Sequence, residues 1–239
     1  MTYGGLIFDF NGVLWWDGHL QEQAWVDVSA RLRGRPLSAG EIDLHVHGRN
    51  NRYTLEYLVG QSLSQSEVAR LSETKETLYR QLCLDQGPAF RLSEGAVELL
   101  DDLAARDIPR AIATASGPPN VDFFVEHLHL DRWFTPDRIV CDDGRRPGKP
   151  APDIYLEAAR RLALDPVRCV VVEDSISGLQ AARAAGVGYL VALGPATIEG
   201  VDAMIEHLGQ LLDHTLFAPG RDAHKVGRAA ARDRRRNRA

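Results

Sequence analysis

The chain has 239 residues, of which 44% are hydrophobic and 26% are charged, and this average composition excludes global disorder. It contains no run of about 18 apolar residues, so a membrane-spanning helix is excluded. An N-terminal apolar stretch interrupted by Asp9 is not a signal peptide. The 3 cysteines are widely spaced and odd in number, which favours free thiols and a reducing, cytoplasmic location.

Charge is distributed unevenly along the chain, whose net charge is −5. Residues 220–239 hold eight Lys or Arg residues and two Asp residues, whereas residues 1–219 hold 20 basic and 31 acidic residues. An acidic body repels nucleic acid and anionic membranes over most of its surface, so any nucleic-acid contact is expected to be weak and confined to the basic tail. We expect that tail to be a solvated terminal extension.

Five segments predict buried parallel strands, because each is a short, nearly continuous apolar run followed by a loop and a helical pattern. They are Leu6–Phe10, Arg110–Thr114, Arg138–Cys141, Cys169–Glu173 and Tyr189–Leu193. The helical patterns that accompany them are Gly95–Ala105, Asn120–Leu128, Pro152–Leu162, Gly178–Ala185 and Ile198–Leu211. This alternation indicates right-handed crossovers and an α/β fold with a doubly wound parallel sheet.

Residues 15–90 do not follow this alternation. They hold amphipathic patterns at about 17–33, 39–47, 51–61 and 65–83, without a good strand. Such an excursion is far longer than a crossover needs, so we predict a small all-helical domain inserted after the first strand. The α/β core then comprises residues 1–14 and 88–219, the helical insertion residues 15–87, and the basic tail residues 220–239.

Residues with chemical function stand where the predicted strands end. They are Asp9 after the first strand, Thr114 at the second, Lys149 after the third, and the pair Glu173 and Asp174 at the fourth. Because the ligand site of such a sheet lies at the carboxyl ends of its strands, we expect these residues to share one pocket. Together they suit phosphoryl transfer, which needs a nucleophile, neutralisation of the phosphoryl oxygens and a hard cation.

Each member of this set has an expected role. The two aspartates carry the oxygen ligands that Mg²⁺ prefers, with water and substrate phosphate completing the shell. Lys149 adds a fixed positive charge that binds phosphate and screens a carboxylate nucleophile. Thr114 and the adjoining backbone at Ala115 are expected to donate hydrogen bonds to the phosphate, and Gly12 lets the first loop approach it closely.

The ordered set resembles the haloacid dehalogenase superfamily, and the helical insertion is similar to the cap of the subgroup that contains β-phosphoglucomutase and phosphoglycolate phosphatase. The motifs that carry the resemblance are Asp9-x-Asn11-Gly-Val, Thr114, Lys149-Pro and Glu173-Asp174. The resemblance implies that Asp9 is a nucleophile that forms an aspartyl-phosphate. It also implies that Asp9, Asp174 and the backbone carbonyl of Asn11 hold Mg²⁺ while Glu173 supports the metal site, and that Thr114 binds and Lys149 orients the phosphate.

One position departs from the family pattern: the second aspartate of the first motif is Asn11 here. In phosphatases and phosphomutases of the family, that aspartate protonates the leaving oxygen and later activates the water or acceptor. Asn keeps the shape and the backbone carbonyl but has no titratable proton. A phosphatase of good leaving groups, a substitute acid–base group, a slow or regulatory enzyme and an inactive phosphate-binding relative therefore all stay open. Asp17 and His19 are the candidate substitutes; without one, Asn11→Asp is expected to raise turnover of alkyl phosphates.

In the insertion, the segment His47–Tyr53 joins two predicted helices, and the resemblance implies a specificity loop in which Arg49 or Arg52 meets an anionic or hydroxylated substrate. The sequence predicts Mg²⁺-dependent hydrolysis of a small phosphate monoester, such as a phosphorylated sugar or related metabolite, through an aspartyl-phosphate on Asp9. The alternatives are a sugar phosphomutase of the β-phosphoglucomutase type and a catalytically impaired phosphate-binding or regulatory relative. Gln21, where that mutase carries a histidine, counts against the mutase.

Overall fold

The computed structural model describes residues 2–213 and 216–217, and the predicted basic tail, residues 220–239, lies outside the described residues. Parallel strands form one six-stranded sheet in the order β3-β2-β1-β4-β5-β6. These strands are β1 (Gly5–Phe8), β2 (Arg110–Ala113), β3 (Ile139–Val140), β4 (Cys169–Glu173), β5 (Tyr189–Leu193) and β6 (Ala203–Ile205).

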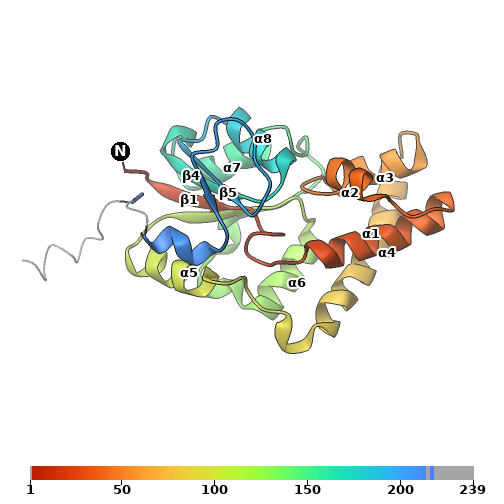
Figure 1. Cartoon of the computed structure of the whole chain (residues 1–239), viewed down its shortest axis with the longest axis horizontal. Helices are drawn as coiled ribbons and strands as arrows, with labels where there is room; N and C mark the ends of the chain where they lie inside the picture. Colours follow the sequence, from red (N-terminus) through yellow and green to blue (C-terminus); the bar gives the residue numbers. More distant parts are fainter. Residues whose placement is uncertain (1, 214–215, 218–239) are drawn as a thin grey trace, which may run out of the picture.

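Helices cover both faces of the sheet (Figure 1). On one face α5 (Ala96–Ala105) and α6 (Pro118–Leu128) pack against Leu6 and Phe8 of β1, and on the other α7 (Asp153–Arg161) and α8 (Ile176–Ala184) pack against Ile7. Successive strand residues point to opposite faces, so one continuous apolar run serves both layers. Short 3₁₀ helices lie at Gly87–Ala89, Leu130–Arg132, Pro136–Arg138, Pro166–Arg168 and Leu208–Asp213. The prediction of an α/β fold with a doubly wound parallel sheet is confirmed.

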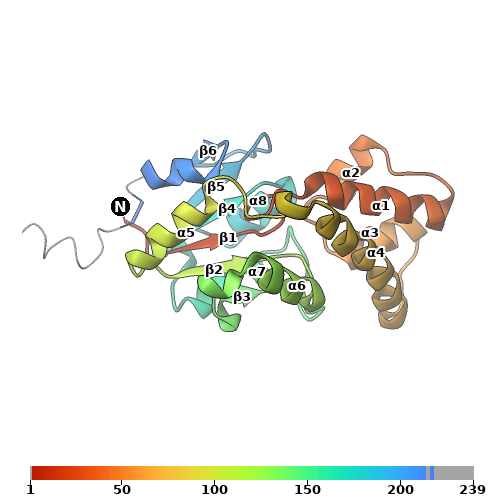
Figure 2. The same cartoon turned by 90° about the horizontal axis from the view of Figure 1, so that it is seen from below.

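Between β1 and α5 the chain forms a helical cap beside the carboxyl ends of the strands (Figures 1 and 2). Its helices are α1 (Gly18–Arg33), α2 (Ala39–His45), α3 (Asn51–Val59) and α4 (Gln65–Asp85). Ser38 and Ser64 start α2 and α4 through capping boxes with Glu41 and Glu67. A small apolar cluster that includes Trp25 packs the cap helices together and is separate from the two clusters of the core. The predicted all-helical insertion is therefore present.

The predicted helix at Ile198–Leu211 is wrong. In its place β6 pairs with β5, and a 3₁₀ helix follows. Gly200 has a left-handed φ of 84°, which interrupts a helix. The Asp202 N–H then donates to Leu190 O, and the Asp202 carboxylate accepts from Leu190 N–H at 2.7 Å. These two bonds draw the segment alongside β5, so the apolar spacing that indicated a helix belongs to a short edge strand. Within the described residues, no helix has the length and apolar character to cross a membrane.

Candidate active site at the carboxyl ends of the strands

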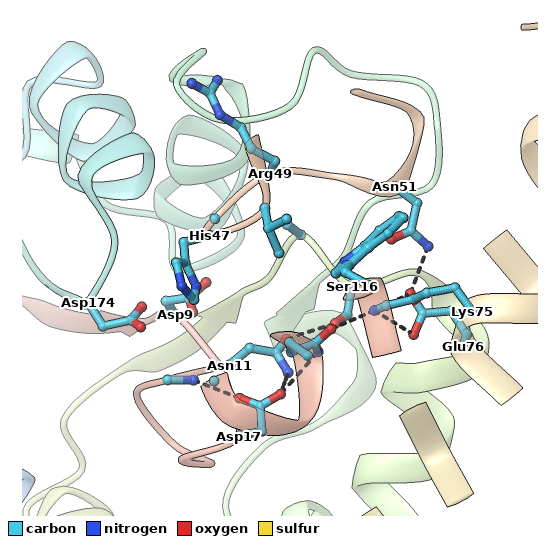
Figure 3. A pocket seen from close by; sticks show the side chains of 17 residues that line it. Asp9, Asn11, Asp17, His47, Arg49, Asn51, Lys75, Glu76, Ser116 and Asp174 are labelled. Atoms are coloured by element: carbon cyan, nitrogen blue, oxygen red, sulfur yellow. Dashed lines mark hydrogen bonds and ion pairs between the residues drawn. The ribbon is translucent and has the colours of Figure 1, made fainter. Parts of the chain in front are cut away.

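Strands β1, β2 and β4 bring the polar residues at their carboxyl ends to one pocket between the core and the cap (Figure 3). Asp9 directly follows β1, Glu173 ends β4, and Asp174 comes next in the chain. Lys149 reaches the same place from the loop between β3 and α7. The strand order reverses beside β1, which is where ligands of such sheets bind. The structure therefore brings Asp9, Lys149, Glu173 and Asp174 together. Thr114 is 1% exposed and is not among the residues that line the pocket.

Lys149 joins the carboxylates of this group. Its ammonium Nζ lies 2.6 Å from Asp9 Oδ1 and also donates to Glu173 Oε1. Glu173 Oε1 accepts a further bond from the Tyr155 hydroxyl at 2.9 Å. Its other oxygen, Oε2, accepts the backbone N–H groups of Asp174 and Ser175, each at 2.8 Å. Glu173 is thus held in place on both oxygens, and Tyr155 is a supporting residue that the sequence patterns did not reveal.

Burial sets the electrostatics of the group, since Asp9 is 5% and Lys149 is 4% exposed. Burial raises the pKa of Asp9 to about 7 even though the Lys149 ammonium opposes the shift. Burial, followed by repulsion from Glu173 and Asp9, raises the pKa of Asp174 well above its ordinary value. Burial acts in the same direction on Glu173, but the Lys149 ammonium prevails and keeps the pKa of Glu173 below its ordinary value. Three carboxyl groups share one ammonium, so the cluster would carry surplus negative charge if all three were ionised.

This surplus charge fits a divalent cation. Asp9, Glu173 and Asp174 each offer a carboxylate oxygen, and these oxygens lie within 4.8 Å of one another. Hard oxygen donors of this kind suit Mg²⁺. Gly12 makes the close approach possible, because its φ is 84° and a Cβ at this position would lie 1.9 Å from Asp174 Oδ2. The residues present are therefore compatible with a bound Mg²⁺ ion.

Asn11 connects the end of β2 to the beginning of the cap. Its amide nitrogen donates to Asp17 Oδ2 at 2.7 Å and to the Tyr79 hydroxyl at 3.2 Å. Its amide oxygen accepts from Ser116 Oγ at 2.8 Å and from Thr114 Oγ1 at 3.3 Å. The amide is therefore engaged on both sides. Ser116 and Tyr79 were not predicted as site residues, because a serine in a loop and a tyrosine on an amphipathic helix carry no distinctive signal.

The two candidate substitutes for the missing aspartate lie in different surroundings. Asp17 lines the pocket and is fully buried, whereas His19 lies exposed on α1 and is not part of the pocket lining. Burial raises the pKa of Asp17 above its ordinary value, against the opposing hydrogen bonds from Tyr79, Asn11 and Gln21. Only Asp17 is placed beside Asn11.

The cap supplies the opposite wall of the pocket (Figure 3). Lys75 of α4 is 2% exposed, and its ammonium lies 2.5 Å from Gln21 Oε1 and 3.1 Å from Glu76 Oε1. Asn51 of α3 donates to the same Glu76 oxygen at 2.7 Å. Sequence reasoning missed Lys75 and Glu76, because adjacent charged residues in a helix ordinarily face solvent. A buried, polar wall faces the carboxylate cluster.

The two arginines predicted for the specificity loop do not share one location. Arg49 lines the pocket, and its guanidinium donates to the Lys149 backbone oxygen at 3.2 Å. Arg52 instead pairs with Glu56 at 3.0 Å and lines a neighbouring groove. The cavity between the cap and the core has a volume of about 70 Å³, whereas small-molecule pockets usually measure about 300–1,000 Å³. Asn51, Glu76 and Ala115 line both this small cavity and the neighbouring groove, so the two adjoin each other.

Comparison with known proteins defines the class to which this fold and site belong. Residues 3–186 match the haloacid dehalogenase-like hydrolase family, and the chain belongs to that family. It is 30% identical to hexitol phosphatase A of Escherichia coli over 88% of this chain and 94% of that protein. It is 38% identical to the plasmid-encoded protein CbbY of Cupriavidus necator, over 49% of this chain and 48% of that protein, so this match spans about half the length of each.

Among solved structures, a family IA haloacid dehalogenase hydrolase from Entamoeba histolytica has the same fold. It is 35% identical in sequence, its TM-score is 0.75, and the match covers 86% of this chain and 93% of that one. The predicted membership of the superfamily, with its helical cap, is confirmed. The chain is an enzyme of the hydrolase class, and its relatives include proteins named as phosphatases of phosphorylated sugars.

Proposed function

We propose that this chain is a Mg²⁺-dependent phosphatase that hydrolyses small phosphate monoesters, with phosphorylated sugars as its substrate class. The observation that carries the proposal is the 2.6 Å contact between Lys149 and Asp9, next to Glu173 and Asp174. A nucleophilic carboxylate, a fixed positive charge and a set of cation ligands are what phosphoryl transfer requires. The buried cluster unites all three.

In the proposed reaction, a carboxylate oxygen of Asp9 attacks the phosphorus atom of the bound ester. The bond between phosphorus and the leaving oxygen breaks, and that oxygen takes up a proton from solvent water and departs as an alcohol. Water then attacks the phosphorus of the aspartyl-phosphate, which releases inorganic phosphate and restores Asp9. Lys149 orients Asp9 and offsets charge on the phosphoryl oxygens, while Thr114 and the backbone at Gly12 and Ala115 bind the phosphate.

The proposed cation ligands are Asp9, Asp174 and the backbone carbonyl of Asn11. Glu173 supports them, because its oxygens are held by Lys149, Tyr155 and backbone N–H groups. When bound, Mg²⁺ supplies further neutralisation of the phosphoryl oxygens. This assignment leaves the Asn11 side chain free of metal contact and engaged in the hydrogen bonds described above.

A hydroxyl-rich leaving group is favoured by the wall that the cap contributes. Gln21, Asn51, Lys75 and Glu76 present amide, ammonium and carboxylate groups toward the pocket, and such groups pair readily with hydroxyls. Relatives named fructose-1-phosphate phosphatase, hexitol phosphatase A and phosphorylated carbohydrates phosphatase support the same substrate class. In this proposal Arg49, which is among the residues that line the pocket, meets the substrate, and Arg52 contacts only a ligand that extends into the neighbouring groove.

We assign the proposed functions to the domains by residue range. Residues 1–14 and 88–219 form the chemical core, residues 15–87 form the cap that closes over it, and a cytoplasmic location suits the free thiols of Cys83, Cys141 and Cys169. A membrane partner forms no part of the proposal, and nucleic-acid contact is assigned only to the basic tail.

The deciding experiment is a screen of phosphate release over hexose and hexitol phosphates, phosphoglycolate and nucleotides, with MgCl₂ or with EDTA. Release from sugar phosphates that requires Mg²⁺ is the expected result. Product analysis with a hexose 1-phosphate identifies a mutase, because a mutase returns the phosphate to another hydroxyl. Beryllofluoride binding without multiple turnover would instead identify a regulatory, phosphate-binding protein.

A further inference from the structure

Asp17 lies at the joint between the core and the cap, and its carboxylate accepts four hydrogen bonds. It directly precedes α1 and is fully buried. Its Oδ1 accepts the Gly12 backbone N–H at 3.0 Å. Its Oδ2 accepts from Asn11 Nδ2 at 2.7 Å, from Gln21 Nε2 at 3.0 Å and from the Tyr79 hydroxyl. The carboxylate therefore ties the first core loop to both α1 and α4 of the cap.

These bonds fix the orientation of the Asn11 amide. A carboxylate can only accept hydrogen bonds, so the Asn11 nitrogen must face Asp17 and the Asn11 oxygen must face the other way. On that side the oxygen receives Ser116 Oγ at 2.8 Å and Thr114 Oγ1 at 3.3 Å. Both hydroxyls belong to the end of β2, where the phosphate site is proposed. A charge at the start of the cap thereby orients two hydroxyls of the core.

We propose that Asp17 is a positioning residue that acts through Asn11, and that its presence makes an amide the group this pocket requires at position 11. The inference rests on the proposed function for its catalytic part. Asp17 and Asn11 act as a matched pair that carries one negative charge. In this chain the carboxylate stands at position 17, at the edge of the cap, instead of two residues after the nucleophile.

An aspartate at position 11 would be mismatched with Asp17. The bond of 2.7 Å between Asn11 Nδ2 and Asp17 Oδ2 would become a contact between two carboxylate oxygens. Like charges this close repel strongly when water is excluded. The Tyr79 hydroxyl, which contacts both positions, has one proton and can donate to only one of the two carboxylates. The family pattern alone predicts that Asn11→Asp raises turnover. Because Asp17 lies beside position 11, we expect repulsion between the two carboxylates to lower turnover instead.

The test is an exchange cycle of four proteins: the wild type, Asn11→Asp, Asp17→Asn, and the double variant that carries both changes. The first single variant pairs two carboxylates and the second pairs two amides, whereas the double variant restores one of each. Melting temperature and kcat for Mg²⁺-dependent phosphate release are measured, the latter well below the melting temperature of every variant. We expect each single change to lower kcat by about 10-fold or more, because misplaced binding groups are costly.

Recovery in the double variant is the result that distinguishes positioning from simple structural support. We expect its melting temperature and kcat to exceed those of Asn11→Asp, as coupled neighbours do in a double-mutant cycle. Additive losses in both quantities would overturn the pairing. An Asn11→Asp protein with wild-type or higher kcat and an unchanged melting temperature would also overturn it.

A control for lost stability alone is Ser29→Ala. Ser29 is fully buried in α1, and its hydroxyl donates to the backbone oxygen of Arg35 at 2.8 Å, so the change leaves this oxygen without its donor. Ser29 is not among the residues that line the pocket, and no hydrogen bond in the described structure joins it to Thr114 or Ser116. We expect a lower melting temperature with kcat within about two-fold of the wild type, while a loss of kcat as large as that of Asn11→Asp would overturn the assignment.

The experiment distinguishes failure of the proposed function from failure of the proposed Asn11–Asp17 pair. If the wild type releases no phosphate from any ester, the proposed function is wrong, yet the melting temperatures of the four proteins still test the Asn11–Asp17 pair. If the wild type is active and the cycle is additive, the phosphatase assignment stands and the positioning role is wrong.

Discussion

The molecule contains two clusters of charged side chains, one in the core and one in the cap, and they differ in their ratio of acidic to basic groups. In the core, Asp9 and Glu173 contact a single ammonium, that of Lys149, and a third carboxylate lies beside them. In the cap the ratio is reversed. Glu41 accepts from Arg33 at 2.7 Å, from Arg35 at 3.0 Å and from the Tyr57 hydroxyl at 2.7 Å.

The two clusters also differ in how well the protein stabilises the negative charge of their carboxylates. The hydrogen bonds from Arg33, followed by those from Arg35, hold the pKa of Glu41 far below its ordinary value, so its charge is fully satisfied by the protein. Burial raises the pKa of Asp9 to about 7, so the protein does not fully stabilise the negative charge of Asp9. A satisfied cluster stabilises the fold, whereas an unsatisfied one is prepared for a ligand that the protein does not itself supply.

The largest expected effect comes from removing the proposed nucleophile. Asp9→Asn should reduce phosphate release by at least about three orders of magnitude, because the amide cannot form the aspartyl-phosphate. Circular dichroism should show an intact fold, since the two side chains are nearly isosteric. Turnover within 10-fold of the wild type, about the loss expected when only positioning suffers, would rule out the covalent mechanism.

The same variant should not be less stable than the wild type in metal-free buffer. The pKa of Asp9 is raised from its ordinary 3.8 to about 7, so the folded protein holds a proton that the unfolded chain has lost. The wild type should therefore lose stability as pH rises from about 4 to about 7, and Asp9→Asn should lose less. Thermal melts in EDTA at a series of pH values provide the comparison, and parallel curves for the two proteins would contradict it.

The next largest effect concerns the metal. EDTA should abolish phosphate release, and added MgCl₂ should restore it and raise the melting temperature, because a ligand of the folded state stabilises that state. Asp174→Ala should raise the Mg²⁺ concentration for half-maximal activity by at least about 10-fold, with partial recovery at high Mg²⁺. Wild-type activity that ignores both EDTA and Mg²⁺ would refute the metal assignment.

Sequence reasoning was strongest where a single physical rule decides the outcome. Buried apolar runs such as the one that ends before Asp9 predict parallel strands, because a strand covered on both faces has no polar side. Parallel strands then place Asp9, Thr114 and Glu173 at one edge of the sheet, so this part of the grouping followed from topology, whereas Lys149 reaches it from the loop between β3 and α7. The short edge strand after Gly200 escaped prediction, since its position depends on bonds between Asp202 and Leu190.

The contacts that cross between core and cap were beyond the reach of the sequence. Asn11 and Asp17 are near each other in the chain, but their contact depends on the tight turn in which Gly12 N–H also donates to Trp15 O at 2.7 Å. Tyr79 lies 62 positions from Asp17 and meets it only because α4 returns to the core. No periodicity or motif encodes such a meeting, because it depends on how two separately packed units are docked.

The cap cluster should respond to substitution in stability rather than in chemistry. Glu41→Gln should lower the melting temperature by about 2–4 °C, because it weakens the bonds to two arginines and the capping of α2. Its kcat should stay within about two-fold of the wild type. Glu157→Gln is a suitable control, since the ion pairs of Glu157 within the described residues are with Arg160 and Arg161 of its own helix. Such surface pairs contribute little. If Glu157→Gln lowers the melting temperature as much as Glu41→Gln does, the cap cluster contributes no more to stability than an ordinary surface ion pair.

The smallest expected effect is the pH dependence of that stabilisation, which runs opposite to the one expected for Asp9. The pKa of Glu41 is lowered from its ordinary 4.5, so as pH falls the unfolded chain takes up the proton first. The contribution of Glu41 is therefore complete above about pH 5 and is progressively lost below it. The melting temperatures of the wild type and Glu41→Gln should differ most near pH 7 and converge as the pH falls toward 3. A difference that stays constant over this range would show that the Glu41 carboxylate acts through shape and not through its charge.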